Sequence, residues 1–252
     1  MTDAIAKTAD ALIAAHKSKT LVPSSQALAL PDLAAGFEVQ ARVAKGLGAT
    51  LAGWKVPKSP EGVRVAAPFY RHACVPSGAR FDLRKGGMIF EIEIAFELKH
   101  DLPPRPGKPY SREEVMDAIG DALIGIEMVG SRFEEPDALP FPTLLADNHG
   151  CAGYVTGARV ADWRKLDFRK ARCVAIVDGK VVFDKVDSHP QKDPLASLVE
   201  YAGMQADRLG GLRAGQIVTT GSLSGVTRID RPVEIAGEIS GIGGVAVKVV
   251  AA

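Results

Sequence analysis

Residues 90–96 read Phe-Glu-Ile-Glu-Ile-Ala-Phe, in which large apolar side chains occupy every second position. A period of two is typical of a β-strand, because successive side chains point to opposite faces of the sheet. Glu91 and Glu93 would then lie side by side on one face. Two neighbouring carboxylates repel each other unless a cation or a proton lies between them. For this stretch alone, solvated glutamates on an exposed strand face are the simpler interpretation.

Further isolated acids favour a different interpretation. Glu127 lies in the apolar run Ile-Gly-Ile-Glu-Met-Val at 124–129, and Asp147 follows Leu-Leu-Ala at 144–146. Each of these acids is on a segment that is otherwise suited to a protein core. Carboxylate oxygens are the ligands that Mg²⁺ and Mn²⁺ prefer. The sequence therefore predicts a site for a hard divalent cation.

The composition is that of an ordinary globular protein with a sizeable core. Hydrophobic residues make up 46% of the 252 positions and charged residues 24%, which suits one large domain or two small ones. A net charge of +1 gives no electrostatic reason to expect nucleic acid or an anionic membrane as a partner. The sequence shows no apolar run of about 18 residues and no secretory signal, so we expect no membrane span and a cytoplasmic protein. Cys74, Cys151 and Cys173 are not spaced as a zinc site or a disulfide framework.

Periodicity divides the chain into a helical beginning and a β-rich remainder. Apolar residues at helical spacing predict helices over 3–17 and 31–46. Two later helices are expected, one after the Ser111 capping box and running to about residue 122, and one over 194–209. We expect an α+β protein with a helical part at 1–48 and a β-rich catalytic domain at 49–252, together forming one continuous structural unit.

The predicted strands are short and separated by turns. They cover 49–57, 90–98, 123–129, 155–160, 171–177, 180–186, 216–221, 232–236 and 243–250. Asp178-Gly179 is a hairpin turn signal between two of them. Residues 58–88 carry repeated prolines and glycines, which predict loops with short strands, and the sequence leaves open whether 58–80 forms a mobile lid.

Several polar residues near the isolated acids are candidates for chemistry. Lys55 lies between Trp54 and Val56 in a predicted strand, where it could bind a carboxylate or move a proton, although most lysines are simply solvated. His149 follows the acid at 147 closely and could contact substrate or water, although a lone histidine is more often structural.

A glycine turn ends the strand at 216–221. Such a turn leaves Thr220 and the backbone N–H groups around Gly221 and Ser222 free to hold an anion.

Six pieces of the sequence, taken in order, carry a resemblance to a known family. They are Gly-Trp-Lys-Val at 53–56, Glu-Ile-Glu-Ile-Ala-Phe at 91–96, Ile-Glu-Met-Val-Gly-Ser-Arg at 126–132, Ala-Asp-Asn at 146–148, Ile-Val-Thr-Thr-Gly-Ser-Leu at 217–223 and Gly-Ile-Gly at 241–243. The ordered set resembles the fumarylacetoacetate hydrolase superfamily, and within it the 2-oxopent-4-enoate hydratase / 4-oxalocrotonate decarboxylase branch.

This resemblance implies a fold, an assembly and a cofactor. The fold would be a mixed β-roll of the fumarylacetoacetate hydrolase C-terminal type, and the assembly a homo-oligomer built from dimers. One Mg²⁺ or Mn²⁺ would bind at Glu91, Glu93 and Glu127. Lys55 and His149 would be the catalytic residues, and Lys55, Asn148, Thr220, Gly221 and Ser222 would contact a small 2-oxo acid.

The resemblance also implies the reaction, a hydratase adding water to 2-hydroxypenta-2,4-dienoate-type acids in aromatic meta-cleavage catabolism. Three departures leave alternatives open: Val-Pro-Lys-Ser at 56–59, the missing acidic lid segment around 68–72, and His-Gly at 149–150 where the branch has Ala-Ser. The alternatives are a 4-oxalocrotonate-type decarboxylase and an acylpyruvate C–C hydrolase in which the histidine activates water. A non-catalytic partner subunit of a hydratase/decarboxylase complex is an alternative from another class.

Overall fold

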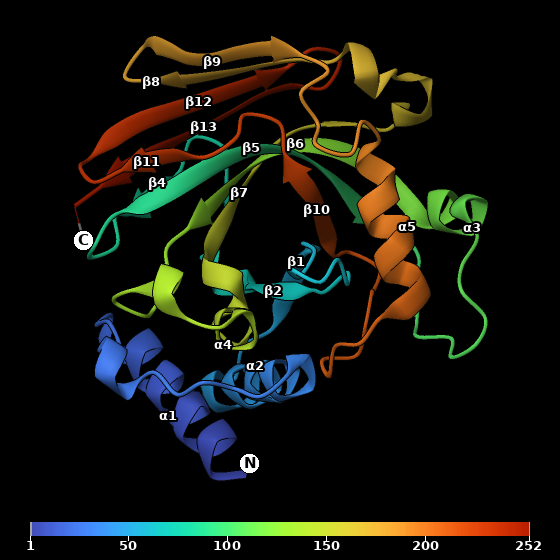
Figure 1. Ribbon diagram of the computed structural model, residues 1–252. Helices are drawn as coiled ribbons and strands as arrows, with labels where there is room; N and C mark the ends of the chain where they lie inside the picture. The colour runs from blue at the N-terminus through green and yellow to red at the C-terminus, as the bar shows by residue number, and fades with distance from the viewer. Residues whose placement is uncertain (1, 252) are drawn as a thin grey trace.

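The computed structural model describes residues 2–251, and the chain folds into two β-sheets with helices at their margins (Figure 1). The larger sheet has the order β2-β1-β10-β5-β6-β7-β3, with β11 paired to β5. Its strands are β1 (Leu51–Lys55), β2 (Ala67–Tyr70), β3 (Cys74–Pro76), β5 (Met88–Leu98), β6 (Ile119–Val129), β7 (Cys151–Val160), β10 (Ile217–Ser222) and β11 (Thr227–Ile229). The α+β class and the roll-like sheet are as predicted.

The smaller sheet has the order β4-β13-β12-β8-β9 and packs over the outer face of β5, β6 and β7 (Figure 1). Its strands are β4 (Arg80–Asp82), β8 (Arg172–Val177), β9 (Lys180–Val186), β12 (Val233–Ile239) and β13 (Gly243–Val250). β8 and β9 form the hairpin predicted at Asp178-Gly179, with both turn residues at positive φ. The edge strand β9 leaves Val181, Val182 and Val186 exposed.

Four of the five described helices begin within two residues of their predicted positions, and two of these four end early, whereas the short helix at 141–146 is not predicted by the sequence. The helices are α1 (Thr2–Ser18), α2 (Leu33–Leu47), α3 (Arg112–Ala118), α4 (Phe141–Ala146) and α5 (Pro194–Met204). Helix α3 ends at residue 118 rather than 122 because Ile119 already pairs with Leu98 in the sheet. Helix α5 ends at residue 204 rather than 209 because Asp207 accepts hydrogen bonds from the backbone of residues 209 and 211 and turns the chain.

The remaining segments are short 3-10 turns and loops. The turns are Ser24–Gln26, Arg71–Ala73, Pro136–Ala138, Asn148–Gly150, Trp163–Lys165 and Phe168–Lys170. Within the segment 58–80, Arg64 is buried and pairs with Glu200 of α5 at 2.6 Å. No helix in the described part of the chain combines the length and apolar character that crossing a bilayer would require.

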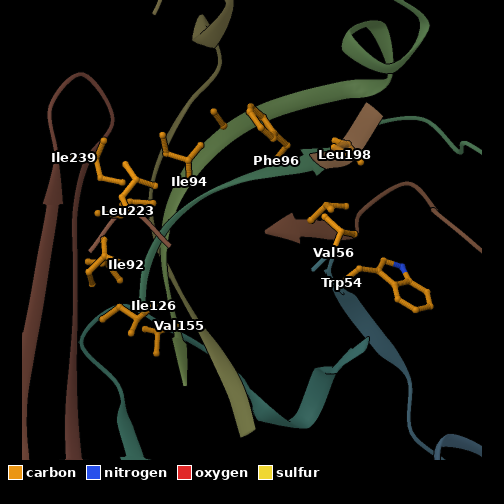
Figure 2. Close-up of a cluster of buried hydrophobic side chains, with 14 of the residues drawn as sticks. Trp54, Val56, Ile92, Ile94, Phe96, Ile126, Val155, Leu198, Leu223 and Ile239 are labelled. Carbon is orange, nitrogen blue, oxygen red and sulfur yellow. The ribbon is translucent and has the colours of Figure 1, made fainter. Parts of the chain in front are cut away.

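The two faces of β5 have different surroundings, as the period of two predicts. Phe90, Ile92, Ile94 and Phe96 are fully buried, and they pack between the sheets with Ile126, Val155 and Ile239 (Figure 2). The opposite face, which carries the two glutamates, lines the inside of the curled sheet. The prediction of a strand is confirmed, but an exposed glutamate face is wrong for Glu93, which is only 2% exposed.

An aromatic pair closes the inside of the roll where β2 approaches β7. The rings of Phe69 and Tyr154 stack with their centroids 4.8 Å apart and an interplanar angle of 7°. Tyr154 is fully buried, and its ring covers Gly125 of β6 so closely that a Cβ at this glycine would overlap the phenol. The sheet can therefore curl this tightly only because residue 125 has no side chain.

Replacing Gly125 by alanine is therefore expected to destabilise the fold. Overpacking a filled core costs about 1–3 kcal/mol, which corresponds to about 2–12 °C in melting temperature for a chain of this size. Gly120→Ala is the matched control, because a Cβ at residue 120 of the same strand meets only ordinary contacts, 3.5 Å from Lys99. Equal melting temperatures for the two variants would contradict this description of the roll.

Candidate metal centre

Three carboxylates meet inside the roll. Glu91 and Glu127 are direct partners across the β5–β6 ladder, and Glu93 is two residues further along β5 on the same face. Ligand oxygens of the three side chains all lie within 4.8 Å of one another. The structure therefore brings together the three residues predicted to bind metal.

Burial and mutual repulsion set the protonation of this cluster. Glu93 and Glu127 are 2% and 1% exposed, while Glu91 is half-buried. Burial, reinforced by the charge of Glu127, raises the pKa of Glu91 to about 7, and burial raises the pKa of Glu93 well above its ordinary value. Three oxygen ligands whose charges oppose one another fit a hard divalent cation, which would remove the repulsion.

Lys55 supplies the only positive charge that directly contacts the cluster among the described residues. Its Nζ donates to Glu127 Oε1 at 2.6 Å and to the backbone carbonyl of His149 at 3.4 Å. Burial would lower the pKa of this lysine, but the neighbouring Glu127 more than reverses that effect, and the pKa is raised. The side chain is only 9% exposed and therefore stays charged inside the protein.

The glycine turn at the end of β10 reaches the same cluster. The Gly221 N–H faces Glu93 Oε2 at 3.4 Å, and the Ser222 hydroxyl donates to the Gly225 carbonyl at 2.8 Å. The Thr220 hydroxyl instead donates to the Ile94 carbonyl at 2.9 Å, so its donor is already engaged by the sheet. The anion at this turn is thus the protein's own carboxylate, and contact of these residues with substrate stays a prediction.

The loop between α4 and β7 has its own ion pair. Asp147 does not join the three carboxylates, so its inclusion among the metal-site acids is wrong. Its Oδ1 pairs with the buried Arg132 at 3.2 Å, and its Oδ2 accepts from Ser131 Oγ and from the Arg132 N–H at 2.8 Å each. This pair fixes Asn148 and His149, which both adopt the left-handed conformation, with φ of 52° and 49°.

His149 lies beside the site and not in the carboxylate cluster. Its ring packs against Phe141 with 5.4 Å between centroids, and burial, aided by the charge of Lys55, lowers its pKa to about 3. The imidazole is therefore neutral. Its role toward water or substrate stays a prediction, whereas its backbone carbonyl does hold Lys55.

Comparison with known proteins identifies the family. Residues 54–250 match the model of the fumarylacetoacetate (FAA) hydrolase C-terminal family. The chain belongs to this family. All three carboxylates and Lys55 lie within the matched region.

Three relatives show how this fumarylacetoacetate hydrolase family chain compares with named proteins. It is 31% identical over 156 residues to a 2-keto-4-pentenoate hydratase of Burkholderia vietnamiensis, covering 62% of this chain and 58% of the relative. It is 27% identical over 179 residues to a 4-oxalocrotonate decarboxylase of Pseudomonas putida, covering 70% and 66%. The fold superposes on a 4-oxalocrotonate decarboxylase from Pseudomonas putida G7, complexed with magnesium and adipate, with TM-score 0.84, 21% identity and coverage of 99% and 98%.

The structure of this family member also reveals a histidine that the sequence analysis missed. His189 is 3% exposed and lies against the Gly221 turn, with its Nε2 3.6 Å from the position that a Cβ on that glycine would occupy. Its Nδ1 accepts from the Gln191 N–H at 3.2 Å, while Nε2 has no hydrogen-bond partner among residues 2–251. A single histidine in a loop has no periodic signal, so only the tertiary contact with β10 reveals it.

The raised carboxyl pKa values predict opposite pH dependences for the metal-free and metal-loaded protein. A group that binds protons more tightly when folded stabilises the fold below its unfolded pKa, and this stability is lost as pH rises through the folded value. The metal-free melting temperature should therefore fall between about pH 4.5 and about pH 7 because of Glu91. Stabilisation by Mn²⁺ should grow over the same range, because protons compete for the carboxylates. Thermal melts with and without Mn²⁺ across this range test it, and parallel curves would contradict it.

Proposed function

We propose that this chain is a divalent-metal-dependent lyase, a hydratase that adds water to 2-hydroxypenta-2,4-dienoate or a similar 2-oxo or 2-hydroxy acid of aromatic meta-cleavage catabolism. The observation that carries the proposal is the cluster of Glu91, Glu93 and Glu127 with Lys55 beside it, inside the roll. Relatives named as hydratases at 31% identity support the reaction class. The matched segments span about three fifths of those relatives, so the substrate is part of the proposal.

The cofactor would be one Mg²⁺ or Mn²⁺ held by Glu91, Glu93 and Glu127. The donors are all carboxylate oxygens, which suit these ions better than softer metals. When bound, the ion would act as a Lewis acid toward the oxygens of a 2-oxo acid.

Lys55 is placed to hold the substrate or move a proton. An ammonium has three N–H donors, of which two face Glu127 and the His149 carbonyl, so one remains for a substrate carboxylate. Gly53, two residues before it on the same face of β1, lies so close to the Ile217 carbonyl of β10 that a Cβ would clash. This close approach of the two strands holds Lys55 against the β10 turn.

Replacing Lys55 by methionine is expected to lower turnover by about 10²- to 10⁴-fold, the usual contribution of a proton-transfer group. Binding of Mn²⁺ should be kept or tightened, because the ammonium no longer competes for the Glu127 carboxylate. Titration calorimetry with Mn²⁺ and steady-state rates at saturating metal separate the two effects. Unchanged turnover would show that Lys55 is only a counter-ion.

A 4-oxalocrotonate-type decarboxylase is the second candidate. The same ion site and lysine would serve loss of a remote carboxylate as carbon dioxide. Support comes from the decarboxylase relative at 27% identity, which covers more of this chain than the hydratase match does. Substrate profiling decides between the two reactions.

An acylpyruvate hydrolase and a non-catalytic partner subunit have less support. The hydrolase would use the neutral His149 as a base for water, but this residue is outside the carboxylate cluster. A structural subunit would have no use for three opposed carboxylates, two of which are almost fully buried.

Turnover of 2-hydroxypenta-2,4-dienoate, followed as loss of its conjugated ultraviolet absorbance, tests the proposal. We expect turnover with Mg²⁺ or Mn²⁺ and none with chelator. Turnover of 4-oxalocrotonate alone would favour the decarboxylase. Turnover of acylpyruvates alone would favour the hydrolase, and no metal-dependent turnover of any of the three would contradict the enzyme assignment.

We further propose a cytoplasmic homo-oligomer built from dimers. The resemblance to the family supports both statements. The unpaired edge of β9 with its three exposed valines supports self-association, because open apolar sheet edges favour pairing with another chain.

A further inference from the structure

A cavity of about 450 Å³ lies between the end of α1 and the larger sheet. Its walls come from the end of α1, from β2, from β4 and the residues after it, and from the start of β7. The cavity is not lined by Lys55 or by any of the three carboxylates of the metal centre. A cavity of this size accommodates a small organic molecule.

The wall of this cavity carries more basic than acidic side chains, since Asp82 is the one acid among the residues that line it. Arg84 and Arg132 line it together with His16 and His72. Arg132 is paired with Asp147 and Lys19 with Asp82, but the Arg84 side chain makes no ion pair or hydrogen bond with any described residue. Burial, with the charges of Arg132, Arg84 and His72 adding to it, lowers the pKa of His16 to about 2, so this imidazole is neutral.

Three buried polar atoms on the cavity wall also lack partners in the part of the chain that the structure covers. They are Tyr70 Oη, Asn148 Oδ1 and Arg132 Nε, on side chains that are 4%, 2% and 2% exposed. Leaving a buried donor or acceptor unpaired is costly, and such atoms in a cavity are commonly satisfied by a ligand. The Tyr70 ring is held between His16 and His72, each with its centroid 5.8 Å away.

The wall also has an apolar part, beside further charged residues such as Lys19, Asp82 and Lys85. Leu21, Val75 and Phe81 contribute side chains, and Ala15 and Ala152 contribute methyl groups. A small inorganic anion would leave these groups facing water. An organic acid would satisfy both parts of the wall.

We propose that this cavity binds a small organic carboxylate, with its charged end at Arg84, Arg132 and the Tyr70 hydroxyl and its apolar body against Leu21, Val75 and Phe81. Charge-assisted hydrogen bonds from a guanidinium are the strongest contacts available for a carboxylate. This inference goes beyond the proposed function, because the metal ligands and Lys55 contribute no residue to the cavity. Asn148, which is also predicted to contact the 2-oxo acid, is shared by the two sites.

Binding of benzoate to the metal-free full-length chain tests the proposal, with benzamide as the uncharged probe of equal shape and phosphate as the probe without an apolar body. We expect benzoate to raise the melting temperature and to bind measurably by calorimetry. Benzamide and phosphate should each bind at least about tenfold more weakly, because each lacks one of the two recognised features.

Variants locate the binding. Arg84→Met should weaken benzoate at least about tenfold. Arg71→Met, an exposed arginine outside the cavity, should not, and neither should Glu93→Gln in the metal centre. Tyr70→Phe removes only the hydroxyl and should weaken benzoate even if Arg84→Met folds poorly. Benzoate binding that survives both cavity variants, phosphate binding as tight as benzoate, or no benzoate binding would each overturn the proposal.

Discussion

Replacing Glu93 by glutamine is expected to remove metal binding and to lower turnover at least about 1,000-fold. The substitution keeps the shape of the side chain but removes one of the two almost fully buried charges of the cluster. The divalent cation would stabilise the charge of the transition state by several kcal/mol, and this stabilisation is lost when the Glu93 carboxylate no longer binds the cation. With Mn²⁺ at a hundredfold excess over its Kd, the free energy of unfolding of the wild-type protein should rise by about 2.7 kcal/mol, or about 5–11 °C in melting temperature. The variant should show no such stabilisation.

The same variant should be at least as stable as wild type without metal. At pH 8 it should be more stable, because an amide carries no charge that burial and repulsion oppose. Glu97→Gln, on the same strand outside the cluster, is the control and should keep both the metal response and turnover. A metal-induced stabilisation of Glu93→Gln equal to that of wild type would show that the ion binds elsewhere.

Replacing Asp147 by alanine is expected to cost about 3–5 kcal/mol of unfolding free energy, or about 6–20 °C. The carboxylate is 2% exposed and is the partner of a guanidinium that is equally buried. Removing one member leaves the charge of Arg132 buried without its partner. The loop that carries Asn148 and His149 would loosen, so turnover should fall as well. Chemical denaturation measures the stability change.

Two controls separate this ion pair from a general loss of charge. The double replacement of Asp147 by alanine and Arg132 by methionine should recover part of the loss, because no unpaired charge remains buried. Asp162→Ala breaks the exposed pair with Lys165 and should cost no more than about 1 kcal/mol. A loss below 1 kcal/mol for Asp147→Ala would contradict a structural role for the buried pair.

The sequence predicts most of the elements of the fold because their patterns are local. The period of two over 90–96 corresponds to strand β5, and Ser111 is the N-cap of helix α3. Helix ends are predicted less well. Apolar residues continue at helical spacing beyond residue 118, but the helix ends there because Ile119 pairs with Leu98 in the sheet. Sequence spacing has no information about that partner strand.

In the candidate site, too, the residues that follow from local patterns are predicted and those that depend on tertiary contacts are not. Two glutamates two residues apart on one strand must share a face, so Glu91 and Glu93 follow from periodicity. The proximity of Glu127 depends on the β5–β6 register, and the resemblance to the family supplied it. Asp147 was misplaced because its partner, Arg132, is recognised only once the loop is folded.

The measurement that tests the central claim most directly is anomalous scattering from Mn²⁺ soaked into crystals of the full chain. A single Mn²⁺ site within coordination distance of Glu91, Glu93 and Glu127 is the predicted result, with no such peak in crystals of Glu93→Gln. A Mn²⁺ peak at another site, with the three carboxylates unchanged, would contradict the account of this protein as a metal-dependent member of its family.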